Sequence, residues 1–309
     1  MRRAHLPRIL PVKGVTVVAA ADPVAASAEG LAGDVKSAVA VYADYEKMLR
    51  DETLDAVVIS TPHSQHFEQA AAAMKRGLHV QLEKPLVIHA DEAKKLLATA
   101  KRKNLILHVA YQRHHLPVYR HIRKLVATGK LGELRSVVGY VTQNWTRAGG
   151  WRLDPKLAGG GMFTDTGSHL VAAALFTSGL IVKEVVATVD HAGFAVDINT
   201  SVSARCANDA IVSLTTIGNA AAHDERLAIH GSKGSIVVEQ YQWAITAVLH
   251  NGEPLKLPAS LKHDNPDAGF FRWIKAGGKG YELPTYALEV AKISEAAYAA
   301  AKAGRTVKV

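Results

Sequence analysis

The sequence predicts an α/β protein in which a parallel sheet is followed by an α+β domain with a large, mostly antiparallel, open-faced sheet. In the first third, short apolar runs alternate with helical patterns, which is typical of βαβ units and a parallel sheet. From about Leu134, strand-like segments follow one another across short polar or glycine turns, which indicates antiparallel pairing. A chain of 309 residues has room for two domains, which we place at residues 1–112 and 113–309.

Four apolar runs form the predicted parallel strands, and helical segments separate them. Because the strands of a parallel sheet are buried on both faces, they are continuous apolar runs rather than alternating ones. The strands are expected at VTVVAAA (15–21), DAVVIS (55–60), LHVQLE (78–83) and LILHVA (105–110). The helices between them are expected from Val24, from about Ser64 to Arg76, and from about Ala90 to Lys103.

The second half carries further strand segments and two helices. The strands are expected in LRSVVGYVTQ, IVKEVVATVDH, TSVSARC, AIVSLTTIG, ERLAIHG, SIVVEQ and WAITAVLH. Helices near 165–178 and 284–302 are expected to pack against this sheet. No low-complexity linker separates the two halves, so we expect them to be closely joined.

Composition narrows the class of protein. Apolar residues make up 48% of the chain and charged residues 21%, which is typical of a soluble globular protein. No apolar run reaches the roughly 20 residues that a membrane helix needs. The single cysteine, Cys206, has no partner for an internal disulfide, which favours a reducing, cytoplasmic location. The basic residues before VTVVAAA resemble a secretion signal only weakly, because Pro7 and Pro11 interrupt them.

The net charge of +9 lies mainly in the first half of the chain. Residues 1–135 hold 21 Lys and Arg against 13 Asp and Glu, whereas residues 136–309 hold 16 against 15. A field of this sign attracts anionic ligands such as a dinucleotide, although solvated helix positions such as KKLLATAKRK explain most of it. The basic residues are not interleaved with aromatic ones and no nucleic-acid motif is found, so no nucleic-acid partner is expected.

The first two strand ends carry residues that suit a nucleotide, since ligands of doubly wound sheets bind beyond the carboxyl ends of the strands. Asp22 follows the first run, where an acidic residue can accept hydrogen bonds from ribose hydroxyls. No Arg or Lys follows Asp22 within a dozen residues to bind a 2′-phosphate, which favours NAD over NADP. After the next run, Ser60 and Thr61 offer hydroxyls, Pro62 stiffens the turn, and Ser64 is a candidate N-cap.

Two histidines and a lysine extend this group. His63 and His66 are three residues apart at a predicted helix start, where surface or ribose contacts are more common than metal ligation, and we predict no metal. In LEKPL, Lys84 stands between Glu83 and Pro85, and this proline restricts the lysine's backbone and can adopt a cis bond. A lysine close to a cofactor's positive ring can exchange protons near working pH. The alternative is an ordinary surface lysine paired with its neighbouring glutamate.

The segment WRLDPKLAGGGMFTDTGSHL holds the remaining candidates. Asp165 and His169 are four residues apart and project from one face if 164–177 is helical. Gly159 to Gly161 precede them and would let the backbone approach a ligand closely. This spacing suits a histidine that takes a hydroxyl proton while Asp165 orients it and keeps it basic. The alternative is a helix-capping aspartate with a buried structural histidine.

Taken together, these segments resemble the family of NAD(P)-dependent dehydrogenases that includes glucose-fructose oxidoreductase, inositol dehydrogenase and the rhizopine-catabolism protein. EKPL and its spacing to GGGMFTDTGSH are the specific features, and the resemblance covers almost the whole chain. The segments that carry it are AADP, YADYEKML, DAVVISTPHSQHFEQAAAAMKRGLHVQLEKPL, HVAYQRH, GKLGELRSV, GWRLDPKLAGGGMFTDTGSH and IHGSKGSIVVE. The resemblance implies a Rossmann-like first domain, and a second domain that binds substrate and forms oligomers.

The resemblance also implies roles for the residues singled out above. Lys84, Asp165 and His169 would be the catalytic residues, with Lys84 or His169 accepting the hydroxyl proton. The residues expected at the cofactor are Asp22, Ser60, Thr61, Pro62, His63, His66, Glu83, Lys84 and Gln112. The residues expected at the substrate are Lys84, Arg113, Trp151, Arg152, Asp165 and His169.

The activity implied by the resemblance is oxidation of one secondary hydroxyl of a sugar, cyclitol or related polyol, in a homodimer or homotetramer built through the second sheet. Two departures from the family pattern stand out. Ala172 replaces an aspartate that the family commonly has there. The first strand and its G-x-G-x-x-G turn, expected before Arg3, are not found in this sequence, so weakened NAD(H) binding and lower stability are expected.

Two alternatives to simple dehydrogenation stay open. A non-catalytic relative would use the same fold to sense a sugar or dinucleotide, which the departure before Arg3 motivates. A redox-neutral lyase or glycosidase would oxidise a sugar transiently, eliminate a group from the adjacent carbon and reduce the product again. Retention of Lys84, Asp165 and His169 favours an enzyme over a sensor.

Overall fold

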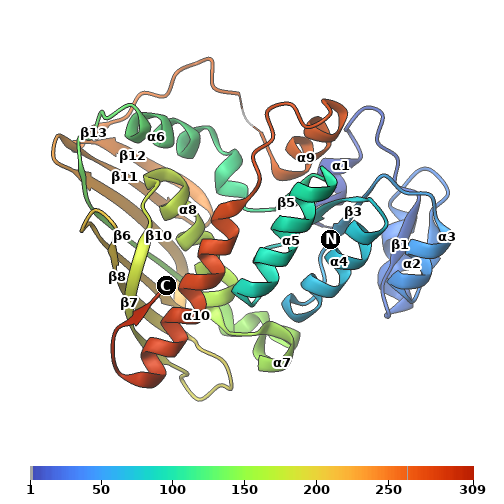
Figure 1. The fold of residues 1–309 in the computed structure, drawn as a ribbon, viewed down its shortest axis with the longest axis horizontal. Coiled ribbons are helices and arrows are strands. Elements are labelled where there is room, and N and C mark those ends of the chain that lie inside the picture. The colour runs from blue at the N-terminus through green and yellow to red at the C-terminus, as the bar shows by residue number, and fades with distance from the viewer. Residues whose placement is uncertain (1–2, 263) are drawn as a thin grey trace.

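The computed structural model describes residues 3–262 and 264–309, which form two joined units (Figure 1). Short parallel strands lie among helices in one unit, and helices cover one side of a large sheet in the other. The C-terminal helix α10 (Thr285–Ala303) lies between them, where it contacts both α5 (Ala90–Lys103) and β7 (Val182–Asp190). The predicted fold class is confirmed by this arrangement.

The strands of the first unit pair in parallel, in two separate sheets. The strands are β1 (Ala19–Ala21), β2 (Ala40–Tyr42), β3 (Ala56–Ile59), β4 (His79–Leu82) and β5 (Leu107–Val109). β1 pairs with β2, and β3, β4 and β5 pair in that order. The helices around them are α1 (Leu6–Ile9), α2 (Ala25–Gly33), α3 (Tyr45–Asp51), α4 (His66–Lys75) and α5.

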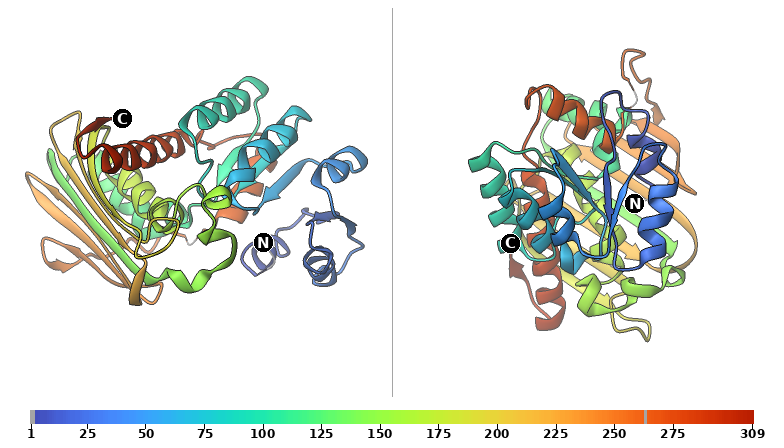
Figure 2. Two further views of the ribbon diagram at one scale, coloured as in Figure 1. Left: turned by 90° about the horizontal axis from the view of Figure 1, so that it is seen from below. Right: turned by 90° about the vertical axis from the view of Figure 1, so that its right-hand side faces the viewer.

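The two small sheets are not hydrogen-bonded to each other within the described part of the chain. Residues 56–58 of β3 are partly exposed, whereas every residue of β5 is buried. β1 covers only three residues of the expected run 15–21, because its partner β2 is itself three residues long. Seen from below, the segment from α1 to β2 stands apart from the β3–β5 sheet (Figure 2). Its apolar side chains form a small core of their own, built from Leu6, Ala20, Ala28 and Leu31.

Helix α5 illustrates why these segments are helical. Its buried side chains recur every three or four residues, so that they lie on one face: Ala90, Ala93, Leu96, Leu97 and Ala100. Acidic residues in its first turn and basic residues in its last turn complement the helix dipole. Asn104, in the left-handed conformation, ends the helix. The sequence-based bounds of this helix are therefore confirmed.

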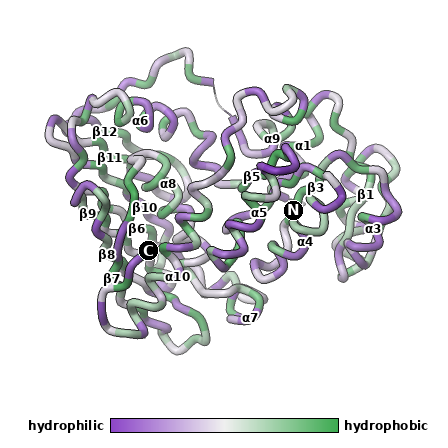
Figure 3. Tube along the Cα trace, viewed as in Figure 1, coloured by the Kyte–Doolittle hydropathy of each residue, from purple (hydrophilic) through white to green (hydrophobic). Residues whose placement is uncertain are grey.

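The large sheet has the strand order β13-β12-β11-β10-β6-β9-β8-β7-β14. Its strands, with β7, are β6 (Leu134–Asn144), β8 (Asn199–Cys206), β9 (Ile211–Ile217), β10 (Asn219–Gly231), β11 (Gly234–Tyr241), β12 (Ala244–His250), β13 (Glu253–Pro254) and β14 (Val307–Lys308). Neighbours pair antiparallel except β6 and β9, which are parallel. Burial alternates residue by residue along β8, and apolar and polar residues alternate along the sheet (Figure 3). Helices α8 (Ser168–Ser178) and α10 pack against one face and leave the other open.

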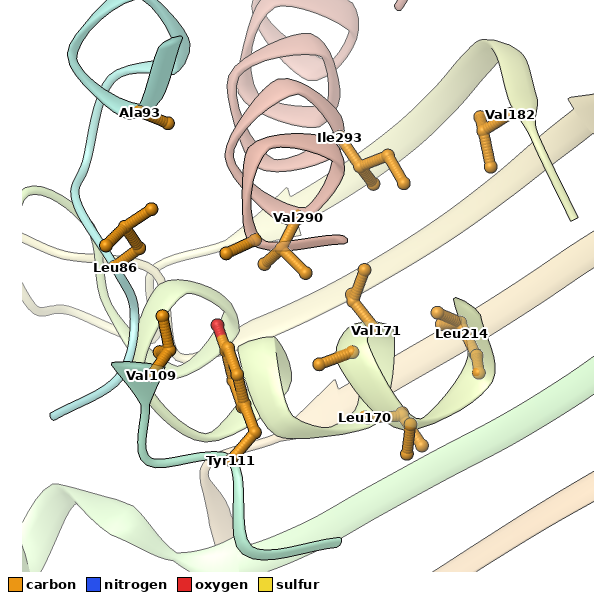
Figure 4. Close-up of a cluster of buried hydrophobic side chains, with 14 of the residues drawn as sticks. Leu86, Ala93, Val109, Tyr111, Leu170, Val171, Val182, Leu214, Val290 and Ile293 are labelled. Carbon is orange, nitrogen blue, oxygen red and sulfur yellow. The ribbon is translucent and has the colours of Figure 1, made fainter. Parts of the chain in front are cut away.

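One hydrophobic core joins the two units. Leu86 and Val109 from the parallel unit lie near Tyr111, Val171 of α8 and Val290 of α10 (Figure 4). Each of these five side chains is at most 1% exposed. Such close packing resists relative movement. The end of β4 is therefore held in a fixed position relative to α8, which matters for the site described below.

The helices that were not predicted include α6 (Pro117–Ala127) and α9 (Pro266–Lys275). Both begin with proline at the first helical position, and the Asn265 side chain caps α9 by accepting a hydrogen bond from the Ala268 N–H at 3.0 Å. α9 contacts α1 and β4, so a segment far along the chain lies against the parallel unit. None of the described helices is both long enough and apolar enough to cross a bilayer.

Candidate active site

Lys84 and Asp165 come together where the two units meet. Lys84 follows β4 and precedes a cis peptide bond to Pro85, as the sequence allowed. Its Nζ donates to the Asp165 main-chain carbonyl at 2.9 Å and also to the Asp165 carboxylate. The Lys84 side chain is 12% exposed and that of Asp165 is 6% exposed. Two residues that are 81 positions apart in the sequence therefore form a nearly buried ion pair.

The Asp165 carboxylate is the centre of a group of donors. Its Oδ2 accepts hydrogen bonds from Trp145 Nε1 at 2.8 Å and from Arg152 Nε at 3.0 Å. His63 Nε2 lies 3.8 Å from its Oδ1. Burial alone raises the pKa of Asp165, but the charges of Lys84 and Arg152 hold it well below its usual range. Asp165 is therefore a permanent anion that holds Lys84 in place.

The glycine run before Asp165 has a different role from the one expected. A Cβ on Gly161 would lie 1.9 Å from the Asp197 carbonyl oxygen, so the glycine allows close approach of the protein's own backbone. The Asp197 carboxylate accepts from the main-chain N–H of Gly161 at 2.6 Å and of Phe163 at 2.8 Å. These bonds anchor the start of a π-helical turn, η5 (Phe163–Gly167), which presents Asp165. For Gly161, the expectation that it faces a ligand is corrected accordingly, whereas Gly159 and Gly160 line a cavity and the expectation stays a prediction for them.

His169 lies on α8, one turn after Asp165, but no hydrogen bond joins the two side chains among the described residues. Its ring lies edge-on to Tyr111, with the centroids 5.6 Å apart, and its buried Nδ1 has no partner. Burial, and then the charge of Lys84, lowers the pKa of His169 well below its usual value. The expectation that Asp165 keeps His169 basic is therefore wrong. His169 is a neutral imidazole with a nitrogen available to a ligand.

The residues expected at the cofactor follow the carboxyl ends of three parallel strands. Asp22 follows β1 and accepts a hydrogen bond from the Val24 N–H at 2.8 Å. Ser60 follows β3, and its buried hydroxyl has no partner. Glu83 follows β4, and its Oε2 accepts from the Lys84 N–H at 3.1 Å. Each of these side chains therefore lies at the edge where ligands of such sheets bind.

The segment after β3 is more deeply buried than the sequence suggested. His66 is fully buried, with Nδ1 2.8 Å from the Pro85 carbonyl oxygen and Nε2 3.0 Å from that of Thr61. His63 is 3% exposed and donates to the Ala158 carbonyl at 2.9 Å. The prediction of surface or ribose-contacting histidines is therefore wrong for His66, which ties two strand-end loops together.

The structure also places Thr61 and Ser64, two further residues of this segment. The Thr61 hydroxyl donates to the Gln69 side chain at 2.9 Å. Ser64 is not an N-cap: it lies inside a 3₁₀ turn, η1 (His63–Gln65), whose N-cap position is Pro62. The described residues contain no group of three or more side chains able to hold a metal ion.

The loop expected at the substrate reaches the Asp165 group. Trp151 and Arg152 lie in the 3₁₀ turn η4 (Gly150–Leu153), and the Arg152 guanidinium lies 4.6 Å from the Trp151 ring centroid. Trp151 in turn lies edge-on to His63 at 4.7 Å. Since Arg152 also donates to Asp165, the loop is connected to the centre of the site by both stacking and hydrogen bonds.

Gln112 and Arg113 lie in the 3₁₀ turn η2 (Gln112–His115), just after β5. The Arg113 guanidinium makes a buried ion pair with Glu225 of β10, while its Nε and Nη1 have no hydrogen-bond partner. Arg113 is thus directed to the large sheet rather than to Lys84. At Ala172, where an aspartate was expected by resemblance, the main-chain carbonyl accepts from His114 Nε2 at 3.2 Å.

Sequence reasoning missed Trp145 and His5. Trp145 follows β6 directly, close in the sequence to the WRLDP loop, and this proximity was the available signal. His5 is 1% exposed and contacts Glu83, but nothing in its neighbourhood in the sequence indicates that contact.

The site suits the ribose and nicotinamide ends of a dinucleotide. The Ser60 hydroxyl and His169 Nδ1 are buried polar atoms that have no hydrogen-bond partner among the described residues, so a ligand could supply one. Asp22 and Glu83 add carboxylates at neighbouring strand ends. The described residues contain no glycine-rich turn that leads from a strand into a helix, the feature that holds a pyrophosphate in this kind of sheet.

Two family models match the chain. The model described as the oxidoreductase family with an NAD-binding Rossmann fold matches residues 1–111. The model described as the GFO/IDH/MocA C-terminal domain matches residues 119–237. Together the matches extend over most of the chain and include the candidate residues named above except Gln112 and Arg113, which lie between the two matched ranges.

Individual proteins of known name are also similar to this chain. Oxidoreductase P35 of Formosa agariphila is 30% identical over 230 residues, which are 72% of this chain and 69% of that protein. Levoglucosan dehydrogenase of Pseudarthrobacter phenanthrenivorans is 29% identical over 224 residues, 63% of this chain and 57% of that protein. The crystal structure of an aldose-aldose oxidoreductase from Caulobacter crescentus, complexed with glycerol, has the same fold: the TM-score is 0.84 at 22% identity, covering 99% and 96% of the two chains.

Proposed function

Because this chain belongs to the GFO/IDH/MocA family of oxidoreductases, we propose that it is an NAD(P)-dependent dehydrogenase acting on a secondary hydroxyl of a sugar, cyclitol or related polyol. The observation that supports this most is the Lys84–Asp165 pair, with neutral His169 one helical turn away. An ammonium donor and a free imidazole nitrogen in one site are the groups that alcohol oxidation requires for its proton.

The cofactor would be held at the strand ends. Asp22 suits the adenosine ribose, and Ser60, Thr61 and Glu83 suit the part nearer the reaction. When bound, nicotinamide supplies the two-electron oxidation of the carbinol carbon. A carboxylate at Asp22 repels a 2′-phosphate, and no cation within the next dozen residues compensates for it. We therefore propose NAD as the preferred form.

His169 is better suited than Lys84 to accept the hydroxyl proton. Lys84 already donates two hydrogen bonds to Asp165, and its ammonium keeps one further donor to orient the substrate oxygen. Burial and the Lys84 charge lower the pKa of His169, which makes its ring a weak base, but the ring is neutral and its Nδ1 has no partner, so that atom can take a proton. In this proposal, Asp165 and Trp145 position Lys84, Lys84 stabilises the developing alkoxide, and His169 Nδ1 takes the proton.

The substrate class follows from the polar groups and from the relatives. The named relative acts on levoglucosan, and the matching crystal structure is of an aldose-aldose oxidoreductase with bound glycerol. Arg152 and Trp151 supply a guanidinium and an aromatic ring beside Asp165, a combination that suits a hydroxyl-rich ring with one apolar face. We propose a cyclic polyol or sugar.

Polyol-dependent reduction of NAD⁺ and NADP⁺, followed by absorbance over a broad panel of sugars and cyclitols, tests this function. Calorimetric titration with NADH, using the same protein, measures cofactor binding separately. The proposal expects turnover with at least one panel member and tighter binding of NADH than of NADPH. Absence of both turnover and NADH binding would contradict it.

A sensor of the same fold is the second candidate, and one observation favours it. The β1–β2 and β3–β5 sheets are unpaired in the described chain, and this weakens the dinucleotide site that catalysis needs. A sensor would bind its sugar or dinucleotide and show no turnover. Ligand binding that persists unchanged in Lys84→Ala, without turnover in the wild-type protein, would support the sensor.

We also propose that the chain forms a homodimer or homotetramer through the open face of the large sheet. Large apolar side chains there are substantially exposed: Val138 (46%), Val186 (46%), Ile211 (50%) and Tyr241 (51%). An apolar patch of this kind is typical of a protein interface. Light scattering on the purified protein should give a multiple of 33.1 kDa, and a monomer at micromolar concentration would contradict it.

A further inference from the structure

His5 lies between two carboxylates from distant parts of the chain. Its Nδ1 donates to Asp267 Oδ1 of α9 at 2.7 Å, and its Nε2 donates to Glu83 Oε1 at 2.8 Å. The His5 and Asp267 side chains are at most 1% exposed. Because an ionised carboxylate only accepts hydrogen bonds, both ring nitrogens must carry a proton. His5 is therefore an imidazolium enclosed in the protein.

The other groups around His5 are consistent with a positive ring. Gln81 of β4 donates to the same Asp267 oxygen at 2.6 Å and accepts from His108 of β5 at 2.9 Å, so it adds no charge. Burial lowers the pKa of His108 well below its usual value, which makes that ring neutral. Arg8 adds a further positive charge to this group, because its Nη1 lies 3.8 Å from Asp267 Oδ2.

The charge balance around His5 explains its protonation. Burial alone lowers the pKa of His5, but the hydrogen bonds and charges of Asp267 and Glu83 outweigh burial and raise it to about 9. The same contacts act on Glu83, since burial raises its pKa while His5 and Lys84 lower it to about 2. At neutral pH, His5 and Glu83 are thus an ion pair whose partners keep each other charged.

We propose that the His5 imidazolium is a positioning residue for Lys84. Two hydrogen bonds connect His5 to the Lys84 backbone. His5 donates to Glu83 Oε1, and Glu83 Oε2 accepts from the main-chain N–H of Lys84 at 3.1 Å. The Glu83 carboxylate can bond the Lys84 N–H only while it is turned back toward its own backbone. A fixed cation beyond it keeps it in that orientation and so fixes the chain at the end of β4.

His5 also connects the position of Lys84 to a segment near the other end of the sequence. Asp267 is on α9, which contacts β4 and α1, so one ring joins the N-terminal helix, the strand end and the C-terminal region. Without the imidazolium, the buried Asp267 carboxylate and the partly exposed Glu83 carboxylate would face each other with no cation between them. Glu83 would then turn toward solvent, and the Lys84 backbone would lose its acceptor.

The matched pair of variants for a test is His5→Gln and His89→Gln. Both remove an imidazole that bonds a glutamate, but His89 pairs with Glu295 at the surface, at 3.1 Å. The readout is the rate at which trinitrobenzenesulfonate labels Lys84, measured by peptide mass spectrometry relative to exposed Lys94 in the same sample. We expect about tenfold faster labelling of Lys84 in His5→Gln, the effect of losing one strong hydrogen bond, and no change in His89→Gln.

Labelling of Lys84 can be measured without turnover, so this test does not depend on the proposed function. Only the predicted effect on kcat rests on the proposed function. If the chain is a dehydrogenase, His5→Gln should lower kcat about tenfold with little change in KM for the polyol. Glu83→Ala is the second variant and should reproduce the faster labelling, even if His5→Gln folds poorly. Unchanged Lys84 labelling in the folded variants would overturn the proposal. An imidazole nitrogen resonance showing wild-type His5 neutral at pH 7 would also overturn it.

Discussion

The two halves of the parallel unit are held in different ways. Around the end of β4, the Lys84 and Glu83 side chains are bound by Asp165 and His5, both almost fully buried. Around the end of β1, the Asp22 carboxylate accepts a hydrogen bond from the N–H of Val24 in its own turn, and from no other group among residues 3–262 and 264–309. Under the proposed function, the protein itself fixes the end of the site that would react, whereas Asp22 would acquire its partners from the ribose of a bound cofactor.

The largest loss of stability and turnover is expected from a substitution of Asp165. Asp165→Ala leaves Lys84 and Arg152 without their anion and Trp145 Nε1 without an acceptor. We expect the free energy of unfolding to fall by about 3–5 kcal/mol, as for other broken buried pairs, and turnover to be lost. Urea denaturation measures the first and NADH formation the second. Asp51→Ala, which removes an exposed carboxylate on α3, is the control and should change neither.

The next largest change is expected from a substitution of His5, whose contribution to stability depends on pH. Its pKa is raised to about 9, so its contribution is fully present below the unfolded value near 6.5 and is lost as pH rises through 9. The shift corresponds to about 3 kcal/mol. Urea denaturation should show His5→Gln less stable than wild type by roughly that amount at pH 6, and the difference should shrink by pH 9.5. A constant difference across this range would contradict the assignment.

Trp145→Phe should lower the free energy of unfolding by a smaller amount. The substitution keeps most of the apolar contact and removes the N–H that donates to Asp165 Oδ2 at 2.8 Å. Loss of one hydrogen bond to a charged acceptor costs about 1.5–3 kcal/mol of unfolding free energy. Because Arg152 still binds the same oxygen, we expect the lower end of that range. Thermal unfolding checks this, and a variant as stable as wild type would show that the bond contributes nothing.

The smallest effect on stability, and the clearest effect on binding, is expected at Asp22. Asp22→Ala removes one hydrogen bond to Val24 N–H in an exposed turn, so its melting temperature should stay close to that of wild type. NADH affinity should fall about tenfold, since two ribose hydroxyls lose a charged acceptor. Calorimetry with NADH decides this, and an unchanged dissociation constant would show that Asp22 does not contact the ribose.

The same contrast explains how far the sequence predicts the structure. Runs such as 78–83 and 105–110 are apolar because their strands are buried, and the pattern therefore locates both the strands and the residues that follow them. Lys84 is recognisable because it stands between a strand end and a proline. Its meeting with Asp165 follows from the family resemblance rather than from any local pattern.

Partners that are distant in the chain could not be predicted in this way. His5 and Asp267 are 262 residues apart, and neither periodicity nor composition relates them. The tertiary environment also reverses local expectations. His66 looks like a surface residue at a helix start but is fully buried, and Gly161 accommodates Asp197 rather than a ligand. Such contacts depend on how the two units pack together, which a linear pattern does not record.

Turnover of Lys84→Ala beside Lys94→Ala is the most direct test that the Lys84–Asp165 pair is the reaction centre. The two variants carry the same substitution, one at the buried end of β4 and one on the exposed face of α5. Polyol-dependent NADH formation, expressed per folded molecule, should fall by at least about 10²-fold in Lys84→Ala and stay at the wild-type rate in Lys94→Ala. Wild-type turnover by Lys84→Ala would contradict the account.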